Sequence, residues 1–279
     1  MEIEDREIQI FQHTLEEISP YDFSGYSLNS LRRRLSKIVD EMKTDVLKLC
    51  HDMRSDTRLV ETIVKKITVN TTELFRDPQV WKQLRYEVLP RYARLPSIHI
   101  WQPGCSTGQE IYSTMMLLED MGLLDKARIY GSDLNEDVLE TARKGIYKYR
   151  FNKEYVDNFE KVFNLSADQT RTVRNIDHRK YFTIDETRDQ IRMNSFLREK
   201  PVYAKIDLVK DQNLFFVNFD LIICRNVIIY FNYELQNRVI KTFHDNMHDR
   251  GCLLLGLHES ILGPCSSYFA KDDFFYYKK

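Results

Sequence analysis

Ile98-His-Ile-Trp-Gln-Pro-Gly-Cys-Ser-Thr-Gly-Gln-Glu110 carries the strongest fold signal in this chain. A strand-like run rich in β-branched residues is followed by two glycines and then by the pattern of an amphipathic helix. Gly104 and Gly108 permit a sharp turn out of a strand and a close approach of the backbone to a ligand, at which the helix N-terminus would point its N–H groups. The stretch therefore predicts a nucleotide-type cofactor loop.

The spacing of the two glycines narrows the choice of cofactor. A dinucleotide loop needs Gly-x-Gly-x-x-Gly, whereas this loop reads Gly-x-x-x-Gly. The next predicted strand ends at Asp133, whose carboxylate is placed to accept both hydroxyls of a ribose. Glu110, at the start of the helix, offers a partner to a cationic amino group. An adenosine cofactor with a small zwitterionic tail remains, and S-adenosylmethionine fits that description.

The chain changes its pattern near residue 98. Residues 1–70 read as helices, and a further helix is expected from Pro78 to Tyr92. From there we expect alternation, with strands near 98–102, 128–133, 203–207, 219–224, 252–257 and 273–278 and helices near 109–121, 135–144 and 232–248. This alternation predicts an α/β fold with a mostly parallel sheet. Lys180–Ile184 and Gln190–Met193 are expected to form an antiparallel hairpin within an interrupting segment.

Three further segments resemble a known family when taken with the glycine loop. They are Asn70-Thr-Thr-Glu-Leu-Phe-Arg76, Phe219-Asp-Leu-Ile-Ile-Cys-Arg-Asn-Val-Ile-Ile-Tyr-Phe231 and Gly256-Leu-His-Glu-Ser260. In this order, the chain resembles the chemotaxis-receptor methyltransferases, the CheR family, from roughly residue 20 to its C-terminus. The last segment departs from the family's usual Gly-His-Ser-Glu order, so we expect His258 to be structural rather than catalytic.

The resemblance implies a domain plan. Residues 1–76 would form a helical substrate-docking domain, 77–97 a linker helix, and 98–279 a Rossmann-like class I methyltransferase domain with a β-subdomain inserted at about 158–200. Family members that grip a receptor tail peptide resemble one another in a glycine-containing loop of that insert. This chain has no glycine between Gly145 and Gly251, so we expect it to act independently of a tail peptide.

The resemblance also implies site residues. Arg76 and Tyr230 would lie at the reactive end as catalytic residues. The implied cofactor-binding residues are Asn70, Thr72, Arg76, Gly104, Glu110, Asp133, Asp207, Leu208, Arg225 and Asn226. The family more usually has Asn-Leu where this chain has Asp207-Leu208. Simpler alternatives are that Asn70, Thr71 or Thr72 caps the following helix, that Arg76 pairs with Asp77 at the surface, that Asp133 only begins a helix, and that Tyr230 belongs to the core.

A basic helix face is the candidate docking surface. Arg32, Arg33, Arg34 and Lys37 lie opposite an apolar stripe, and the resemblance implies that they bind the acidic cytoplasmic helices of a chemoreceptor. The alternative is an ordinary solvated face.

Composition bounds the remaining possibilities. A net charge of −1 gives no general attraction for nucleic acid. Five scattered cysteines, an acidic start and no apolar run of membrane-spanning length predict a cytoplasmic protein that does not enter a membrane. His244 and His248 have a helical zinc spacing but lack the other ligands, so no metal is expected. We expect a monomer.

Two other functions fit the same residues. One is a sensor or scaffold that binds S-adenosylmethionine without transferring its methyl group. The other is a methyltransferase whose acceptor is not a chemoreceptor. The primary expectation is transfer of a methyl group from S-adenosylmethionine to glutamate side chains of chemoreceptor helices, with S-adenosylhomocysteine as product.

Overall fold

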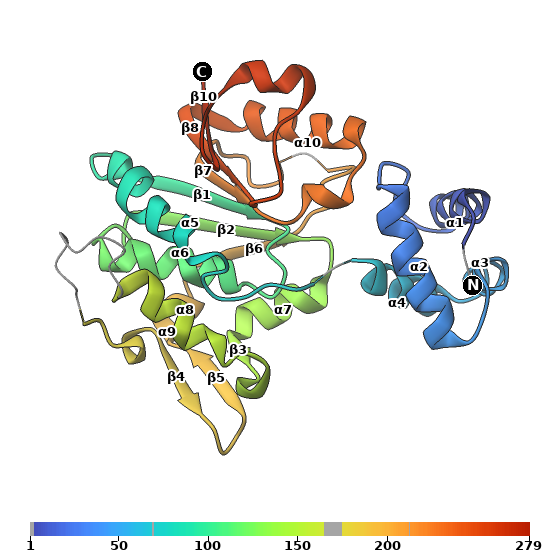
Figure 1. The fold of residues 1–279 in the computed structure, drawn as a ribbon, viewed down its shortest axis with the longest axis horizontal. Helices are drawn as coiled ribbons and strands as arrows, with labels where there is room; N and C mark the ends of the chain where they lie inside the picture. Colours follow the sequence, from blue (N-terminus) through green and yellow to red (C-terminus); the bar gives the residue numbers. More distant parts are fainter. Residues whose placement is uncertain (1–2, 69, 165–174, 212) are drawn as a thin grey trace.

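A computed structural model describes residues 3–68, 70–164, 175–211 and 213–279. The N-terminal helices form a group with a core of its own, drawn in blue in Figure 1. They are α1 (Asp5–Ile18), α2 (Leu28–Met42), α3 (Val46–Met53) and α4 (Thr57–Ile67). Asp45 caps α3 by accepting a 2.8 Å hydrogen bond from the Lys48 amide. These four helices confirm the prediction that this part of the chain is helical.

The expected helix from Pro78 to Tyr92 is divided into three parts. α5 covers Pro78–Gln83, a π-helical turn covers Leu84–Val88, and a 3₁₀ turn covers Leu89–Tyr92. Pro90 has no N–H to donate to an α-helical ladder, which explains why the regular helix does not continue through it.

The main sheet has seven strands in the order β6-β2-β1-β7-β8-β10-β9. β1, β2, β6, β7 and β8 run parallel, and β10 and β9 pair antiparallel at one edge. The bounds are β1 (Ile98–Pro103), β2 (Ala127–Asp133), β6 (Val202–Lys205), β7 (Phe219–Cys224), β8 (Met247–Leu255), β9 (Phe269–Asp272) and β10 (Phe275–Lys278). The order reverses beside β1, a point at which open α/β sheets bind ligands.

Helices cover both faces of this sheet. α6 (Gln109–Asp120), α8 (Glu154–Phe163) and α5 pack on one face, whereas α10 (Tyr233–Asp245) packs on the other. α7 (Glu136–Lys144) lies beside β2 and β6, and α9 spans Ser195–Arg198. The result is the predicted α/β architecture. Successive strand residues point their apolar side chains to opposite faces of the sheet, where they pack into two separate cores.

A second, three-stranded antiparallel sheet has the order β3-β5-β4. Its strands are β3 (Ile146–Tyr147), β4 (Phe182–Asp185) and β5 (Gln190–Met193), so the predicted hairpin is confirmed. Part of the segment predicted as the insert, residues 165–174, lies outside the described residues. Short 3₁₀ turns complete the chain at Tyr149–Phe151, His178–Lys180, Ile228–Tyr230 (η5) and Gly263–Tyr268.

The prediction of a helix up to residue 248 was wrong at its end. α10 ends at Asp245 because the Asn246 side chain donates a 2.8 Å bond to the Thr242 carbonyl and caps the last turn. β8 then begins at Met247, opposite Phe219 of β7. Among the described residues, we find no helix with the length and apolar character that a membrane crossing requires.

Candidate functional site

The glycine loop turns sharply at the carboxyl end of β1. Gly104 and Gly108 have φ values of +67° and +87°, in the left-handed region that glycine tolerates. A Cβ on Gly104 would lie 2.5 Å from a Val227 methyl carbon, and one on Gly108 would lie 2.7 Å from the Ala142 Cβ. Both glycines are therefore required by conformation and by close packing.

Asp133 lies at the end of β2 and holds the loop. One carboxylate oxygen accepts a 2.9 Å bond from the Ser106 amide, and the other accepts a 3.0 Å bond from the Asn135 amide. Asn135, not Asp133, caps the helix that follows. Burial raises the pKa of Asp133, and the backbone donors oppose that effect. A carboxylate with remaining acceptor capacity thus faces the space beside the loop.

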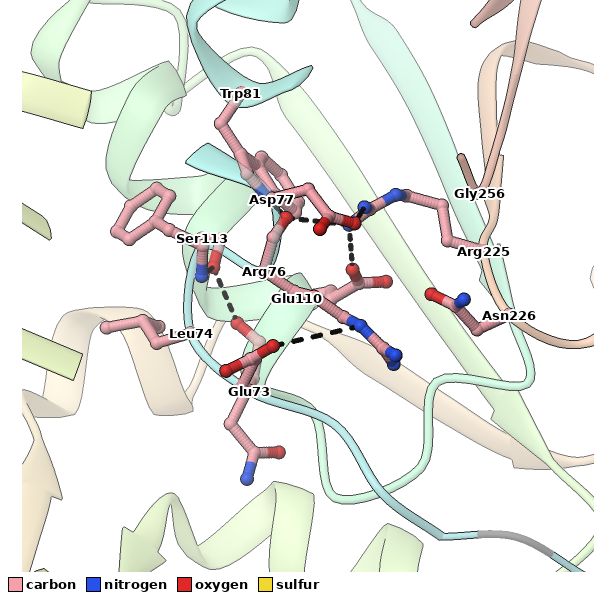
Figure 2. A network of polar contacts seen from close by, with 12 residues as sticks. Glu73, Leu74, Arg76, Asp77, Trp81, Glu110, Ser113, Arg225, Asn226 and Gly256 are labelled. Carbon is pink, nitrogen blue, oxygen red and sulfur yellow. Dashed lines mark hydrogen bonds and ion pairs between the residues drawn. The ribbon is translucent and has the colours of Figure 1, made fainter. Parts of the chain in front are cut away.

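A buried arginine links three segments, as Figure 2 shows. The Arg225 side chain is 0% exposed and lies between Asp77, at 2.6 Å, and Glu110, with which it also forms an ion pair. It donates a further 3.1 Å bond to the Arg76 carbonyl. Burial raises the pKa of Glu110, and the Arg225 guanidinium opposes that rise. The network fixes Glu110 in the first turn of α6.

The segment before α5 places Arg76 at the same site. Its Nε lies 3.7 Å from a Glu73 carboxylate oxygen, and Asp77 pairs with Arg225 instead. The alternative of an Arg76–Asp77 ion pair is therefore wrong. The helix cap proposed for Asn70, Thr71 or Thr72 is also wrong, because α5 begins at Pro78 with Asp77 as its N-cap residue.

One cavity brings the predicted residues together at the carboxyl ends of the parallel strands. It encloses about 1000 Å³ including its open mouth, which suits a small-molecule ligand. All of the predicted cofactor and catalytic residues line it: Asn70, Thr72, Arg76, Gly104, Glu110, Asp133, Asp207, Leu208, Arg225, Asn226 and Tyr230. Tyr230, expected in the core by the simpler alternative, lies in η5 and is half-buried at the wall.

Several polar atoms at this cavity are buried without a hydrogen-bond partner among the described residues. They are the Ser106 hydroxyl, the Asn226 side-chain oxygen, the Arg34 Nε and the Arg225 Nε. Buried polar groups are normally satisfied, so unpaired ones facing a cavity indicate a polar ligand. Acceptors for hydroxyls and an amino group, and a donor for a carboxylate, suit an adenosine bearing an amino-acid tail.

The N-terminal helices contribute part of the wall. Tyr26, Ser30, Leu31 and Arg34 line the cavity. The Ser27 amide donates a 2.9 Å bond to the Tyr230 carbonyl, and the Asn232 amide donates a 2.8 Å bond to the Gly25 carbonyl. These bonds connect the segment before α2 directly to the segment after β7.

The four candidate docking residues on α2 have different surroundings. Arg33 and Lys37 are exposed, whereas Arg34 lines the cavity. Arg32 is engaged within the helical group, since it donates to the Ile3 carbonyl at 3.0 Å and pairs with Asp5. Arg33 and Lys37 are thus the members of this set most accessible to a partner.

Two groups of side chains at the site were not predicted. The Gln109 side-chain Nε2 donates a 2.7 Å bond to the Tyr155 hydroxyl, and the Tyr147 hydroxyl donates a 2.7 Å bond to the Thr107 carbonyl, so the three-stranded sheet and α8 support the glycine loop. Glu259 lies buried beneath the segment after β7, whereas its neighbour His258 is exposed. Only tertiary contacts reveal these roles.

The comparisons with known proteins identify the family. The profile described as "CheR methyltransferase, SAM binding domain" matches residues 70–177 and 160–271. A Pseudomonas putida protein, provisionally named methyltransferase Cher3, is 34% identical over 86% of this chain and 84% of its own. A Listeria innocua protein named chemotaxis protein methyltransferase is 28% identical over 92% of this chain and 91% of its own. The chain belongs to the CheR methyltransferase family, and S-adenosylmethionine is its cofactor.

The likeness to solved structures is much weaker. Magnesium protoporphyrin IX methyltransferase of Synechocystis, with bound S-adenosylhomocysteine, aligns with 64% of this chain at 16% identity and a TM-score of 0.34. This chain covers only 54% of that protein's length. So low a TM-score does not bear on the reaction.

Proposed function

We propose that this protein transfers a methyl group from S-adenosylmethionine to glutamate side chains on the cytoplasmic helices of a chemoreceptor. The observation that carries the proposal is the position of α2 at the cofactor cavity, where Arg34 forms part of the wall and Arg33 and Lys37 lie exposed on the same helix. Relatives named chemotaxis protein methyltransferase support this choice of acceptor.

The residues at the sheet edge would bind the cofactor in extended form. Asp133 would accept the ribose hydroxyls, and Asp207 and Leu208 would lie beside the adenine. Glu110 would attract the amino group of the methionine portion, while Asn70, Thr72 and Arg76 would surround its reactive end. The two terminal nitrogens of Arg225 are engaged by Asp77 and Glu110, so Arg225 would hold Glu110 in place. Its Nε has no partner among the described residues and would remain as a donor at the cavity.

The chemistry requires little from acid–base groups of the protein. The bound cofactor supplies a methyl group attached to a sulfonium sulfur. An exposed glutamate has a reference pKa of about 4.3, so the acceptor is already ionised at neutral pH and needs no general base. Arg76 and the Tyr230 hydroxyl would orient the carboxylate, and the enclosed cavity would exclude water from the reacting charges.

The helical group at residues 1–76 would dock the acceptor. A receptor helix that presents glutamates is complementary in charge to Arg33, Arg34 and Lys37, and such complementarity accelerates encounter and sets register. We further propose that the protein acts in the cytoplasm, as a monomer and without gripping a receptor tail peptide. Residues 77–97 would be the linker and residues 98–279 the methyltransferase domain.

The test uses purified chemoreceptor cytoplasmic fragments and S-adenosylmethionine labelled in its methyl group. We expect label in the fragment that mild alkali releases as methanol, because carboxyl methyl esters are alkali-labile. Replacement of the modified glutamates by glutamine should abolish that label. Stable label that resists alkali would indicate a different acceptor group, and cofactor binding without transfer to any fragment would favour a sensor.

A further inference from the structure

The Glu259 carboxylate lies beneath the segment that follows β7 and accepts hydrogen bonds from four main-chain amides. One oxygen accepts from Asn226 and Gly256, both at 2.7 Å, and the other accepts from Val227 at 2.9 Å and Ile229 at 3.3 Å. The residue is 8% exposed. A buried carboxylate satisfied in this way is a rigid attachment point, because charged acceptors form stronger hydrogen bonds than neutral ones.

The segment attached to Glu259 carries two residues of the cavity wall. Asn226 and Tyr230 both line the cavity, and the Asn226 side-chain oxygen is buried without a partner among the described residues. In Figure 2, the Asn226 side chain points toward Glu110 and Arg76. The backbone of Asn226 is left-handed, with φ of +60°. A non-glycine residue in this region is strained and persists only where its surroundings fix it.

Gly256, at the end of β8, makes this attachment possible. A Cβ at this position would lie 2.6 Å from the Glu259 carboxylate and 3.1 Å from the Asn226 amide nitrogen. The absence of a side chain therefore lets the carboxylate lie between the ends of β7 and β8, where it reaches amides of both.

We propose that Glu259 is a positioning residue of the cofactor cavity, which sets the backbone of 226–229 so that the side-chain oxygen of Asn226 and the ring of Tyr230 face the ligand. Glu259 itself is absent from the cavity wall, and both of its oxygens are occupied by amides. It therefore has no part in the chemistry as a base. The inference rests on the cavity as the cofactor site and is independent of the acceptor.

A purely structural role predicts a different response to mutation. In Glu259→Gln the side chain keeps its length and shape, but an NH₂ group replaces one oxygen and opposes two of the amide donors. If Glu259 is a positioning residue, this change should increase the mobility of residues 226–230 alone and weaken ligand binding. If Glu259 stabilises the fold in general, the change should increase mobility throughout the chain.

The experiment combines hydrogen exchange by mass spectrometry, titration with S-adenosylhomocysteine and thermal unfolding. Asp220→Asn is the matched control, because the Asp220 carboxylate accepts a 2.8 Å bond from the His99 amide at the opposite end of β7. For E259Q we expect faster exchange confined to residues 226–230 and Gly256, whose amides bond Glu259 or lie in the attached segment, and binding weakened about tenfold, which corresponds to ~1.4 kcal/mol. The unfolding midpoint of E259Q should fall, because two buried amides lose their acceptor, but exchange elsewhere in the chain should stay at the wild-type rate. The control should keep the wild-type ligand affinity.

Two results would overturn the assignment. The first is wild-type affinity and wild-type exchange at residues 226–230 in folded E259Q, and the second is accelerated exchange throughout the chain. If E259Q does not fold, Gly256→Ala provides the same test, since its methyl group displaces the carboxylate while the charge is kept. Wild-type affinity in that variant would equally contradict the proposal. Methyl transfer is not used as a readout, so a wrong acceptor leaves this test intact.

Discussion

Arg225 and Glu110 form a buried ion pair that joins the end of β7 to the first turn of α6. The same guanidinium contacts Asp77, so one arginine connects the glycine-loop helix, the fourth parallel strand of the chain, and the segment before α5. Removal of one partner from a buried pair leaves uncompensated charge, which costs far more than the loss of a surface pair.

Arg225→Met should lower the free energy of unfolding by about 3–5 kcal/mol, because Glu110 loses its cation in a buried position. Denaturant unfolding measures this change. The control is Lys66→Met, which breaks the largely exposed 2.6 Å pair with Glu41 and should cost no more than ~1 kcal/mol. Equal losses in the two variants would show that the buried network does not stabilise the site.

Gly104→Ala should weaken S-adenosylhomocysteine binding at least about tenfold and destabilise the protein by on the order of 2 kcal/mol, because it adds strain at positive φ and a contact with Val227. Calorimetric titration and thermal unfolding measure both effects. Gly122 is a matched control, with φ of +68° and open space around its Cβ position. Gly122→Ala should cost about 1 kcal/mol of stability and leave ligand affinity unchanged. A Gly104→Ala variant that behaves like this control would argue against a close-packed cofactor loop.

The double charge reversal Arg33→Glu with Lys37→Glu should raise KM for a receptor fragment roughly tenfold, and added salt should reduce the difference, since both side chains are exposed. Affinity for S-adenosylhomocysteine should not change. Lys271→Glu on β9, at the opposite edge of the sheet from β6, is the control and should leave KM unaltered. The docking surface is assigned wrongly if both charge changes have the same effect.

Acidification should weaken S-adenosylhomocysteine binding. Burial raises the pKa of Asp133 and of Glu110 above their ordinary values of 3.8 and 4.5, and the ligand needs both in the ionised form. Affinity should therefore fall as the pH decreases through these raised values. Titrations at about pH 5 and about pH 7.5 test the direction, and Asp133→Asn should lose part of the dependence. Unchanged pH dependence in Asp133→Asn would show that Asp133 does not contribute to it.

In the protein without ligand, the free energy of unfolding depends on pH in the opposite direction to ligand affinity. The folded pKa of Asp133 is raised, so its contribution to stability is fully present below the unfolded pKa and is lost as the pH rises through the folded value. Wild type should therefore lose stability relative to Asp133→Asn across that interval, as denaturant unfolding at several pH values would show. A stability difference that does not vary with pH would contradict the raised pKa.

Local sequence was sufficient to predict the elements that carry the cofactor loop. The apolar run at Ile98, the two glycines and the following helix pattern are all within a few residues of one another, so β1, the turn and α6 follow from local preferences. β3 and β9 were not predicted. β3 is two residues long and pairs with Ile191, which lies far along the chain. β9 forms a local hairpin with β10 but buries only its first residue, so no apolar alternation marks it in the sequence.

The family motifs identified which residues would line the cavity, but the motifs do not specify how those residues are held. Tyr26 and Leu31 lie in the N-terminal helical region and reach the cavity only through tertiary packing. The packing of α1 against α2 likewise determines that Arg32 is engaged within the helical group while Arg33 is exposed. Glu259 appears in sequence only as part of a shuffled motif, and its four amide partners become visible only when β7 and β8 are placed side by side.

The most direct measurement is a calorimetric titration of wild type and Asp133→Ala with S-adenosylhomocysteine. We predict a dissociation constant in the micromolar range for wild type, equivalent to about −8 kcal/mol, and binding at least about a hundredfold weaker for the variant. Asp220→Asn, which loses a carboxylate at the far end of β7, should bind like wild type. Equal affinity of wild type and Asp133→Ala, or no binding by folded wild type, would contradict the assignment of this cavity as the cofactor site.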